Sequence, residues 1–284
     1  MKWPIQTLES SEFPSLLREI PTAPTTLNYR GQLPPNDHKL LSIVGPRQYT
    51  HYGEEVLNYL VDGLAGYPIC IVSGLALGID SLAHKRALRS NLYTLAIPGG
   101  GLDDSVIYPA RHKKLASDIL DAGGGLLSEY DPKFKATLWS FPQRNRLVAG
   151  ISHATLLVEA GEKSGTLITA RLVADFNREL LVVPGNIFSR NSAGVHQFLK
   201  LGATPVTDSR DILDSLHIAA HEAVISNITK EENLVINALQ EPLQQDELLR
   251  RLPLETSQAS VLLMQMVLKG LIAEKGGFYH SLLN

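Results

Sequence analysis

Between residues 40 and 216 the sequence alternates between short apolar runs and longer amphipathic segments. The apolar runs have the length of β-strands, and one such as ICIVSG at 69–74 is hydrophobic at nearly every position rather than at every second one. Runs of this kind are typical of strands that helices cover on both faces. The alternation therefore predicts an α/β domain with a Rossmann-like, doubly wound and mostly parallel sheet.

Strand and helix positions follow from the same pattern. Strands are expected at 40–45, 69–74, 93–98, 126–129, 155–159, 180–184 and 205–207. Helices are expected at 52–65, 79–89, 111–122, 143–148, 167–177, 194–201 and 209–216. Glycines mark the ends of several of these strands. Because sheets of this type bind ligands at the carboxyl ends of their strands, the glycine-marked ends are expected to meet in one crevice.

The flanking segments have different patterns. Residues 1–39 contain six prolines, which predicts an irregular arm with one short helix near Pro14 that packs on the main domain. Residues 217–231 are interpreted as a linker. Residues 232–284 predict three helices followed by a β-hairpin, the plan of a winged-helix domain.

The charge balance limits how this chain can contact nucleic acid. The formal net charge is -3, which argues against a surface coated in basic residues but leaves room for a local basic groove. Residues 40–216 carry 17 basic and 17 acidic residues, whereas residues 232–284 carry 4 and 6. Any DNA contact is therefore expected in the larger domain.

Compartment and membrane association can also be judged from the sequence. The single cysteine, Cys70, lies inside an apolar run and is interpreted as a buried, reduced thiol. No apolar run has the length of a membrane span, and the first residues lack the core of a signal peptide. We expect a soluble, cytoplasmic protein.

The segment from Trp139 to Arg171 carries the strongest functional signal. Phe141 stands just before Arg144, Asn145 and Arg146, and a strand-length run then leads to a turn at the start of a helix. That turn contains Lys163, Ser164, Gly165 and Thr166. Free N–H groups at a helix start bind anions, guanidinium groups add phosphate contacts, and an aromatic ring offers a stacking face. The segment predicts a site for a phosphate-bearing ligand, either a nucleotide or a nucleic-acid strand.

Three earlier turns could contribute to the same site. Gly45 and Arg47 follow the first strand of the alternating region, with Pro46 between them, and Ser73 with Gly74 follow the second. Gly99 and Gly100 follow the third. None of these turns forms the dinucleotide fingerprint G-x-G-x-x-G or the P-loop. Downstream of Gly74, Asp80 is expected to cap a helix, and His84 to make a structural contact with Asp80.

Signatures of catalysis and of metal binding are missing from the sequence. It contains no H-E-x-x-H, no cluster of cysteine and histidine, and no G-x-S-x-G. We therefore expect neither a metal, nor a cofactor, nor catalytic residues.

Taken together, these motifs resemble those of the DNA-processing protein A (DprA/Smf) family. The residues that carry the resemblance lie at 72–84 (VSGLALGIDSLAH), 141–146 (FPQRNR), 158–170 (VEAGEKSGTLITA), 183–185 and 202–203. The resemblance is close over residues 12–216 and looser over the winged-helix segment. It departs from the family at Pro46, where members usually carry Ser or Thr, so one phosphate contact is expected to be lost.

The resemblance implies a protein that binds single-stranded DNA without catalysing a reaction. It implies a role in natural transformation and recombination, with loading of the RecA recombinase, release of single-strand-binding protein, and a homodimer formed through the core. By position, the DNA site implied by the family consists of Gly45, Arg47, Ser73, Gly74, Gly99, Gly100, Phe141, Arg144, Arg146, Lys163, Ser164, Gly165 and Thr166.

Two other functions remain open at this point. A phosphoribohydrolase of the same fold would need P-G-G-x-G-T-x-x-E, but the glycines and Gly165-Thr166 are far apart, and Thr169 stands where the carboxylate is needed. A nucleotide sensor would bind a small phosphate ligand in the crevice and use the winged helix as its effector.

Overall fold

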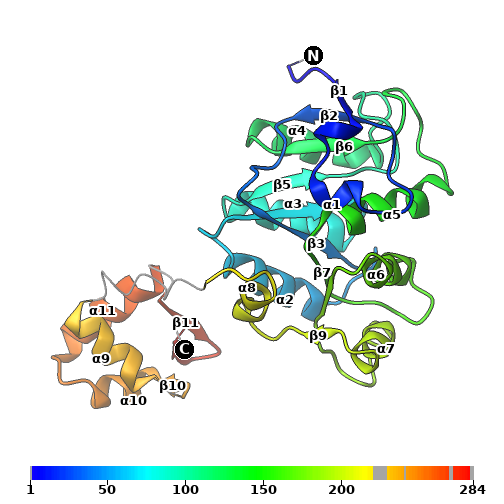
Figure 1. Ribbon diagram of the computed structural model, residues 1–284. Helices are drawn as coiled ribbons and strands as arrows, with labels where there is room; N and C mark the ends of the chain where they lie inside the picture. The colour runs from blue at the N-terminus through cyan, green and yellow to red at the C-terminus, as the bar shows by residue number, and fades with distance from the viewer. Residues whose placement is uncertain (1, 220–228, 240, 269–270, 282–284) are drawn as a thin grey trace. The chain divides into compact units, whose positions relative to one another are not determined.

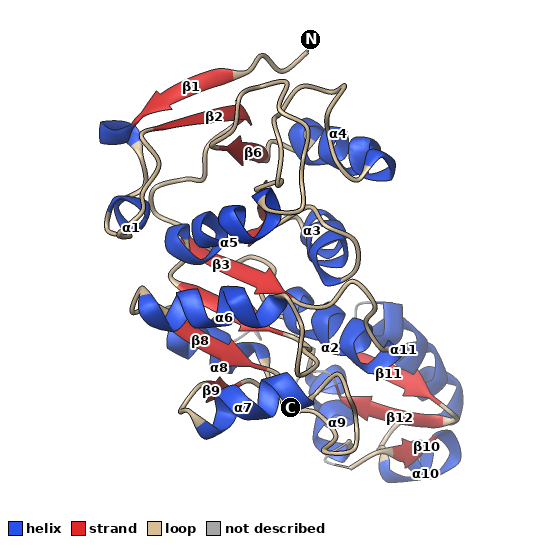
Figure 2. Cartoon of the chain, turned by 90° about the vertical axis from the view of Figure 1, so that its right-hand side faces the viewer, coloured by secondary structure: helices blue, strands red, loops and turns tan. Residues whose placement is uncertain are grey.

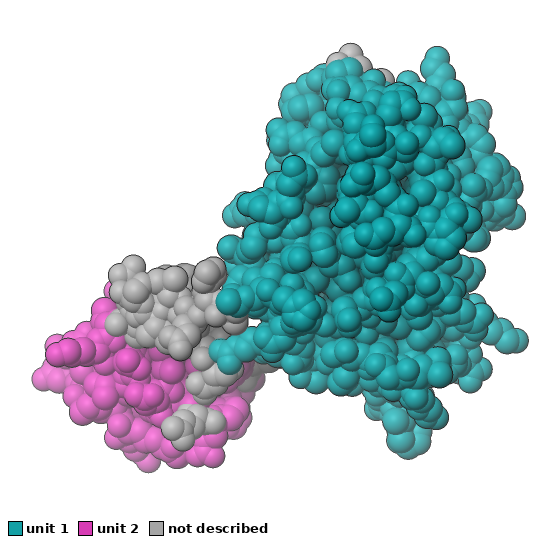
Figure 3. All heavy atoms as spheres, viewed as in Figure 1, with its two compact units in different colours: residues 1–219 teal, residues 220–284 magenta. Residues whose placement is uncertain are grey.

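A computed structural model describes residues 2–219, 229–239, 241–268 and 271–281. The chain divides into two compact units, residues 1–219 and 220–284, which are described separately (Figure 3). Most of the expected linker, 217–231, lies outside the described residues.

A nine-stranded sheet forms the centre of the first unit, in the order β1-β2-β6-β5-β4-β3-β7-β8-β9 (Figure 1). All neighbouring pairs from β6 to β9 in this order are parallel, which confirms the mostly parallel sheet expected from the sequence. Its parallel strands are β3 (Lys39–Val44), β4 (Ile69–Ser73), β5 (Tyr93–Ala96), β6 (Gly125–Ser128), β7 (Ala154–Leu157), β8 (Glu179–Val182) and β9 (Thr204–Pro205).

Residues 1–39 contribute to this sheet, so the expectation of an irregular arm is wrong for much of that segment. Strand β1 (Gln6–Glu9) pairs with β2 (Thr26–Gly31), and β2 continues the sheet by pairing antiparallel with β6. The prolines lie outside these two strands. Each of these short strands buries only one or two side chains, so neither gives the alternating or the continuous apolar pattern that predicts a strand. The short helix near Pro14 is present as α1 (Ser15–Arg18).

Helices cover both faces of the sheet, as the doubly wound arrangement requires. The first face carries α1, α5 (Ser140–Ile151), α6 (Thr166–Asp175) and α7 (Ala193–Lys200), and Figure 2 shows the last three in front of the strands. The second face carries α2 (His51–Asp62), α3 (Ile79–Arg89), α4 (Lys113–Asp121) and α8 (Ser209–Ser215).

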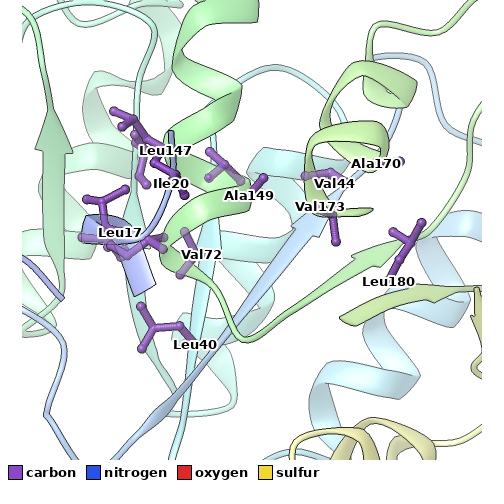
Figure 4. Packing of buried hydrophobic residues seen from close by; sticks show 14 of the residues in the cluster. Leu17, Ile20, Leu40, Val44, Val72, Leu147, Ala149, Ala170, Val173 and Leu180 are labelled. Atoms are coloured by element: carbon purple, nitrogen blue, oxygen red, sulfur yellow. The ribbon is translucent and has the colours of Figure 1, made fainter. Parts of the chain in front are cut away.

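The central strands divide their side chains between the two faces. In β3, Leu40 and Val44 pack in the core of the first face, whereas Leu41 and Ile43 pack in that of the second. Figure 4 shows Leu40 and Val44 among the side chains that α1, α5 and α6 bring to the first core. Because side chains alternate along a strand, a strand buried on both faces is expected to be mostly apolar. β3 is apolar except for Lys39 at its start and for Ser42, whose buried hydroxyl donates to the carbonyl of Val148 at 2.8 Å.

Helix α5 is longer than the predicted 143–148: it begins at Ser140 and ends at Ile151, three residues further at each end. Pro142 therefore lies in its first turn. Proline is tolerated there, since the first N–H groups of a helix have no partner within the helix. The early start places Phe141 and Arg144 on one rigid helix.

The second unit has its own core and its own small sheet. It contains α9 (Lys230–Ala238), β10 (Leu243–Gln244), α10 (Gln245–Arg251), α11 (Thr256–Leu268), β11 (Ile272–Lys275) and β12 (Phe278–Ser281). The three helices and the β11–β12 hairpin are those expected from the sequence, and β10, which was not expected, pairs with β12. Side chains such as Val235, Leu263 and Tyr279 form the core.

Neither unit contains a helix, within the residues that the structure describes, that is long and apolar enough to cross a membrane.

His84 is a fully buried residue of α3 with a structural role, but its hydrogen-bond partner differs from the one expected. Its Nδ1 lies 2.7 Å from the hydroxyl of Thr94 on β5, and not against Asp80. Burial lowers the pKa of His84 to about 3, and the charges of His112 and Arg144 act in the same direction. The imidazole is therefore neutral in the folded protein.

This burial predicts loss of stability in acid. The folded-state pKa is depressed, so the contribution of His84 is complete above its ordinary pKa of 6.5 and is lost as the pH falls toward 3. For one such histidine the free energy of unfolding should fall by about 1.4 kcal/mol per pH unit across that window. Urea unfolding of the protein and of a His84→Gln variant measures this. Equal pH dependence in the two proteins would contradict the prediction.

Candidate nucleic-acid interface

A cavity of about 360 Å³ opens at the carboxyl ends of the central strands. Four segments supply most of its wall: the turn after β3, the loop after β4, the N-terminal half of α5, and the start of α6. After β3 the chain proceeds through β4, β5 and β6 on one side, and then returns to β7 on the other side of β3. The cavity thus lies at the position where the strand order reverses, which is where open α/β sheets bind ligands.

Most of the residues that the sequence suggested for this site line the cavity. They are Gly45, Arg47, Gly74, Phe141, Arg144, Asn145, Ser164, Gly165 and Thr166. Ser73, Gly99, Gly100, Arg146 and Lys163 are not part of the lining.

Arg47 and Phe141 form the mouth of the cavity. The guanidinium carbon of Arg47 lies 5.7 Å from the centre of the Phe141 ring, within the range of a cation–π contact. Tyr108, which is half exposed, packs against the same ring at a centroid distance of 5.7 Å. Arg47 is the exposed cation of the lining, so this corner presents a positive charge and an aromatic face to a ligand.

Gly99 supports Phe141 from behind rather than contacting a ligand. A Cβ atom at Gly99 would come within 2.5 Å of the Phe141 ring. The carbonyl of Gly99 also accepts a hydrogen bond of 2.5 Å from the Ser140 hydroxyl. Gly100 packs similarly closely against residues 134–136. The glycine turn after β5 is therefore needed for close packing against the start of α5.

Arg144 lies in the wall of the cavity, but its hydrogen bonds are made to the protein. The side chain is buried, and Nη1 donates to the carbonyl of Gly74 at 2.5 Å and to the carbonyl of Ile97. Its Nε donates to Asn145 at 3.2 Å. Arg144 thereby joins α5 to the chain that leaves β4 and β5.

Asp80 is the carboxylate closest to this arginine in the cavity wall. Burial raises the pKa of the Asp80 carboxyl, and the positive charge of Arg144 opposes that shift. The expectation that Asp80 caps α3 is wrong. The N-cap is Gly78, and Asp80 accepts a hydrogen bond of 3.4 Å from the N–H of Ala76. Gly74 separates the two charged groups, and a side chain there would collide with both.

Arg146 lies away from the cavity. It pairs with Glu129, and the two side chains are only 13% and 10% exposed. Burial raises the pKa of Glu129, and Arg146 opposes this. Residues two apart on a helix do not share a face, so Arg144 and Arg146 cannot both point toward one ligand. The sequence suggested a pair of arginines that hold phosphates, and the structure does not bring them together.

The start of α6 forms the opposite wall. Gly165 is its N-cap and offers no side chain to accept the first N–H groups. The Ser164 hydroxyl accepts from the N–H of Thr166 at 3.2 Å and donates to its hydroxyl at 2.9 Å. Lys163 is exposed just outside this wall. A helix start of this kind attracts an anion.

Several lining residues were not suggested by the sequence. Ile168 and Thr169 lie one turn beyond Gly165 on α6, and their helical spacing could have indicated them. Thr169 presents a hydroxyl where a phosphoribohydrolase would need a carboxylate. Within the part of the chain that the structure describes, no group of histidine, cysteine and acidic side chains is arranged to hold a metal ion.

The position of Arg144 predicts a large effect on stability. Replacement of Arg144 by Ala leaves two carbonyls without their donor and Asp80 without its nearby charge, and should lower the free energy of unfolding by about 3–5 kcal/mol. Chemical denaturation measures this. The exposed Arg47→Ala is the matched control and should change stability by less than about 0.5 kcal/mol. Equal stabilities for the two variants would contradict the structural role of Arg144.

The comparisons with known proteins agree on one family. The family model for DNA recombination-mediator protein A matches residues 4–217. Protein Smf of Escherichia coli is 38% identical over 213 residues, which are 75% of this chain and 56% of that protein. The DNA processing protein DprA of Bacillus subtilis is 34% identical, over 74% of this chain and 70% of that protein. The chain thus spans little more than half the length of some curated relatives.

Solved structures give the same result. The crystal structure of DprA from Streptococcus pneumoniae matches with a TM-score of 0.69 and 34% identity, over 75% of this chain and 74% of that one. A structure of DNA processing protein A from Helicobacter pylori, described for its single-stranded DNA binding mode, matches with a TM-score of 0.66 and 29% identity, over 76% and 96%. The chain belongs to the DNA recombination-mediator protein A family.

Proposed function

We propose that this protein binds single-stranded DNA in the cavity at the carboxyl ends of β3 and β4, as part of DNA processing. The observation that carries the proposal is the corner where the Arg47 guanidinium lies over the Phe141 ring. A cation and an aromatic ring close together provide two contacts for an unpaired nucleotide, because the cation binds its phosphate and the ring stacks on its base. The relative from Helicobacter pylori, described as a single-stranded DNA binder, supports the same function.

A single strand suits this corner better than a duplex. In a duplex the base faces are already stacked on their neighbours, whereas single-strand sites use aromatic rings as stacking platforms. Several polar side chains of the wall also hydrogen-bond within the protein: Arg144 donates to Gly74 and Asn145, and Ser164 donates to Thr166. We infer binding that depends on the backbone and on stacking, with little preference for sequence.

Further parts of the proposal rest on the resemblance to the family. They are loading of the RecA recombinase onto the bound strand, release of single-strand-binding protein, formation of a homodimer, and action on incoming DNA in the cytoplasm during natural transformation. In this proposal the protein holds DNA and catalyses no reaction. The winged-helix assignment of the second unit is likewise an interpretation, supported by its three helices and its antiparallel sheet.

The corner can be tested by removing its two groups separately. Phe141→Ala should weaken binding of oligothymidylate by about 1–3 kcal/mol, which is about 5- to 150-fold in Kd. Arg47→Ala should reduce the log–log dependence of affinity on salt by about 0.7, the value for one phosphate of a single strand. Fluorescence anisotropy across a salt series measures both quantities.

Arg171→Ala serves as the control, because Arg171 is exposed on α6 outside the cavity lining. It should change neither quantity. If all three variants bind as the unmodified protein does, the cavity is not the DNA site. Equal affinity for duplex and single strand would also count against the proposal.

The second unit is expected to bind duplex DNA weakly. Its longest helix, α11, carries no basic residue, and the exposed side chains include Val261 and Met264. Non-specific DNA binding depends on the neutralisation of phosphates by basic side chains, so such a surface has little to offer a duplex. A comparison of duplex affinity between the full chain and a chain ending at residue 219 tests this. A large loss on truncation would show that the second unit reads DNA.

A further inference from the structure

A second, larger depression of about 960 Å³ lies next to the cavity and contains a concentration of positive charge. We call it the α3–α4 groove, because these two helices and the turn after β3 supply most of its lining. Its walls contain five cations against a single carboxylate. The cations are Arg47, Lys85, Arg89, Arg111 and Lys114. Over residues 40–216 the charges balance, so this groove is an exception to the domain around it.

The cations are not explained by ion pairs within the protein. Among the described residues, Lys85, Arg89 and Arg111 form no salt bridge, and only Lys114 is paired, with Asp118 at 3.0 Å. Arg86, by contrast, lies between Lys85 and Arg89 in sequence and pairs with Asp62. The protein thus neutralises the arginine that points away from the groove and leaves those within it exposed.

Two arrangements of these residues bring positive charges into unfavourable positions without a ligand. Lys85 and Arg89 are four residues apart on α3, where like charges oppose each other. Arg111 lies in the turn just before α4 and Lys114 in the first turn of that helix, and this first turn has no acidic residue. Positive charges at that end oppose the helix dipole. An anion bound between the two helices reduces both the repulsion between like charges and the unfavourable interaction with the helix dipole.

The groove is continuous with the cavity. Arg47 and Leu77 line both. A small pocket lined by Arg47, Tyr108 and Phe141 lies at the junction. Tyr49, which is 37% exposed, lines the groove just beyond Arg47. A path with alternating cations and aromatic rings therefore runs from Phe141 past Arg47 and Tyr49 to Lys85 and Arg89.

We propose that a single DNA strand continues from the cavity through the α3–α4 groove, where Lys85, Arg89 and Arg111 hold its successive phosphates. This inference rests on the proposed function, because it extends the same strand. The repeated cations fit a polynucleotide backbone, whereas a mononucleotide would be satisfied by the cavity alone. A strand held along both depressions also explains how a protein of net charge -3 retains DNA: the positive charge is gathered along one path.

Oligonucleotide length separates the groove from the cavity. For an oligothymidylate of about 20 nucleotides, the triple variant Lys85→Ala/Arg89→Ala/Arg111→Ala should reduce the log–log salt dependence of affinity by about 2, at about 0.7 per phosphate. For an oligothymidylate of about 5 nucleotides, near the lower end of single-strand site sizes, the triple variant should bind with the same affinity as the unmodified protein. A strand of this length occupies the cavity without reaching the groove. The control Lys113→Ala/Arg171→Ala/Lys200→Ala removes as many exposed charges outside the groove and should alter neither oligonucleotide.

A crosslinking experiment gives a second readout. Cys70 is the only cysteine of the sequence, and it is buried with its thiol pKa raised to about 12 by that burial. A Lys85→Cys variant therefore carries one reactive thiol, to which a photoactivatable group can be attached. We expect it to crosslink to the longer oligothymidylate and not to the shorter one.

The results distinguish the inference from the proposed function. If both oligonucleotides bind but the triple variant behaves as its control does, the groove holds no DNA and the cavity site stands. Loss of duplex affinity alone in the triple variant would overturn the inference in favour of a duplex site. If neither oligonucleotide binds the unmodified protein, the proposed function fails and the inference fails with it.

Discussion

One buried guanidinium determines the geometry of the cavity. Arg144 donates to carbonyls that follow β4 and β5, and it belongs to the helix that carries Phe141. A buried charge is stable only when it is well hydrogen-bonded, so the helix is held in one position relative to the two strand ends. The aromatic face at the mouth is thereby rigid before any ligand arrives. Pre-organisation of this kind reduces the entropy lost when a flexible strand binds.

Six cations on or near the walls of the cavity and the α3–α4 groove form two groups. Arg144 is buried and donates to backbone carbonyls, and the mostly buried Arg146 pairs with Glu129. Arg47, Lys85, Arg89 and Arg111 are exposed and line one continuous path. Only the second group is available to phosphates without breaking an internal contact. The first group fixes the shape of the site, and the second supplies its attraction for a polyanion.

The strands and helices between residues 39 and 215 could be predicted from the sequence because burial on both faces favours a mostly apolar pattern in β3 and β4. The antiparallel strands β1 and β2 could not, because they are short and bury only some of their side chains. The cavity was predicted correctly in its position, since the topology directs strand ends to one edge. The separate roles of Arg144 and Arg146 depend on which face of α5 each occupies, and the prediction placed the start of that helix too late.

The sequence by itself determined the α/β architecture, the glycine-marked strand ends, and the set of residue types that can bind phosphate. Only the tertiary structure decided which of those residues face solvent and which face the protein. In the folded chain Arg144 donates to the carbonyl of Gly74, and Gly99 packs against the ring of Phe141. Lys85, Arg89 and Arg111 line the same groove. The physical reason is that local patterns encode burial and helix spacing, whereas the partner of a charged side chain is fixed by chain segments distant in sequence.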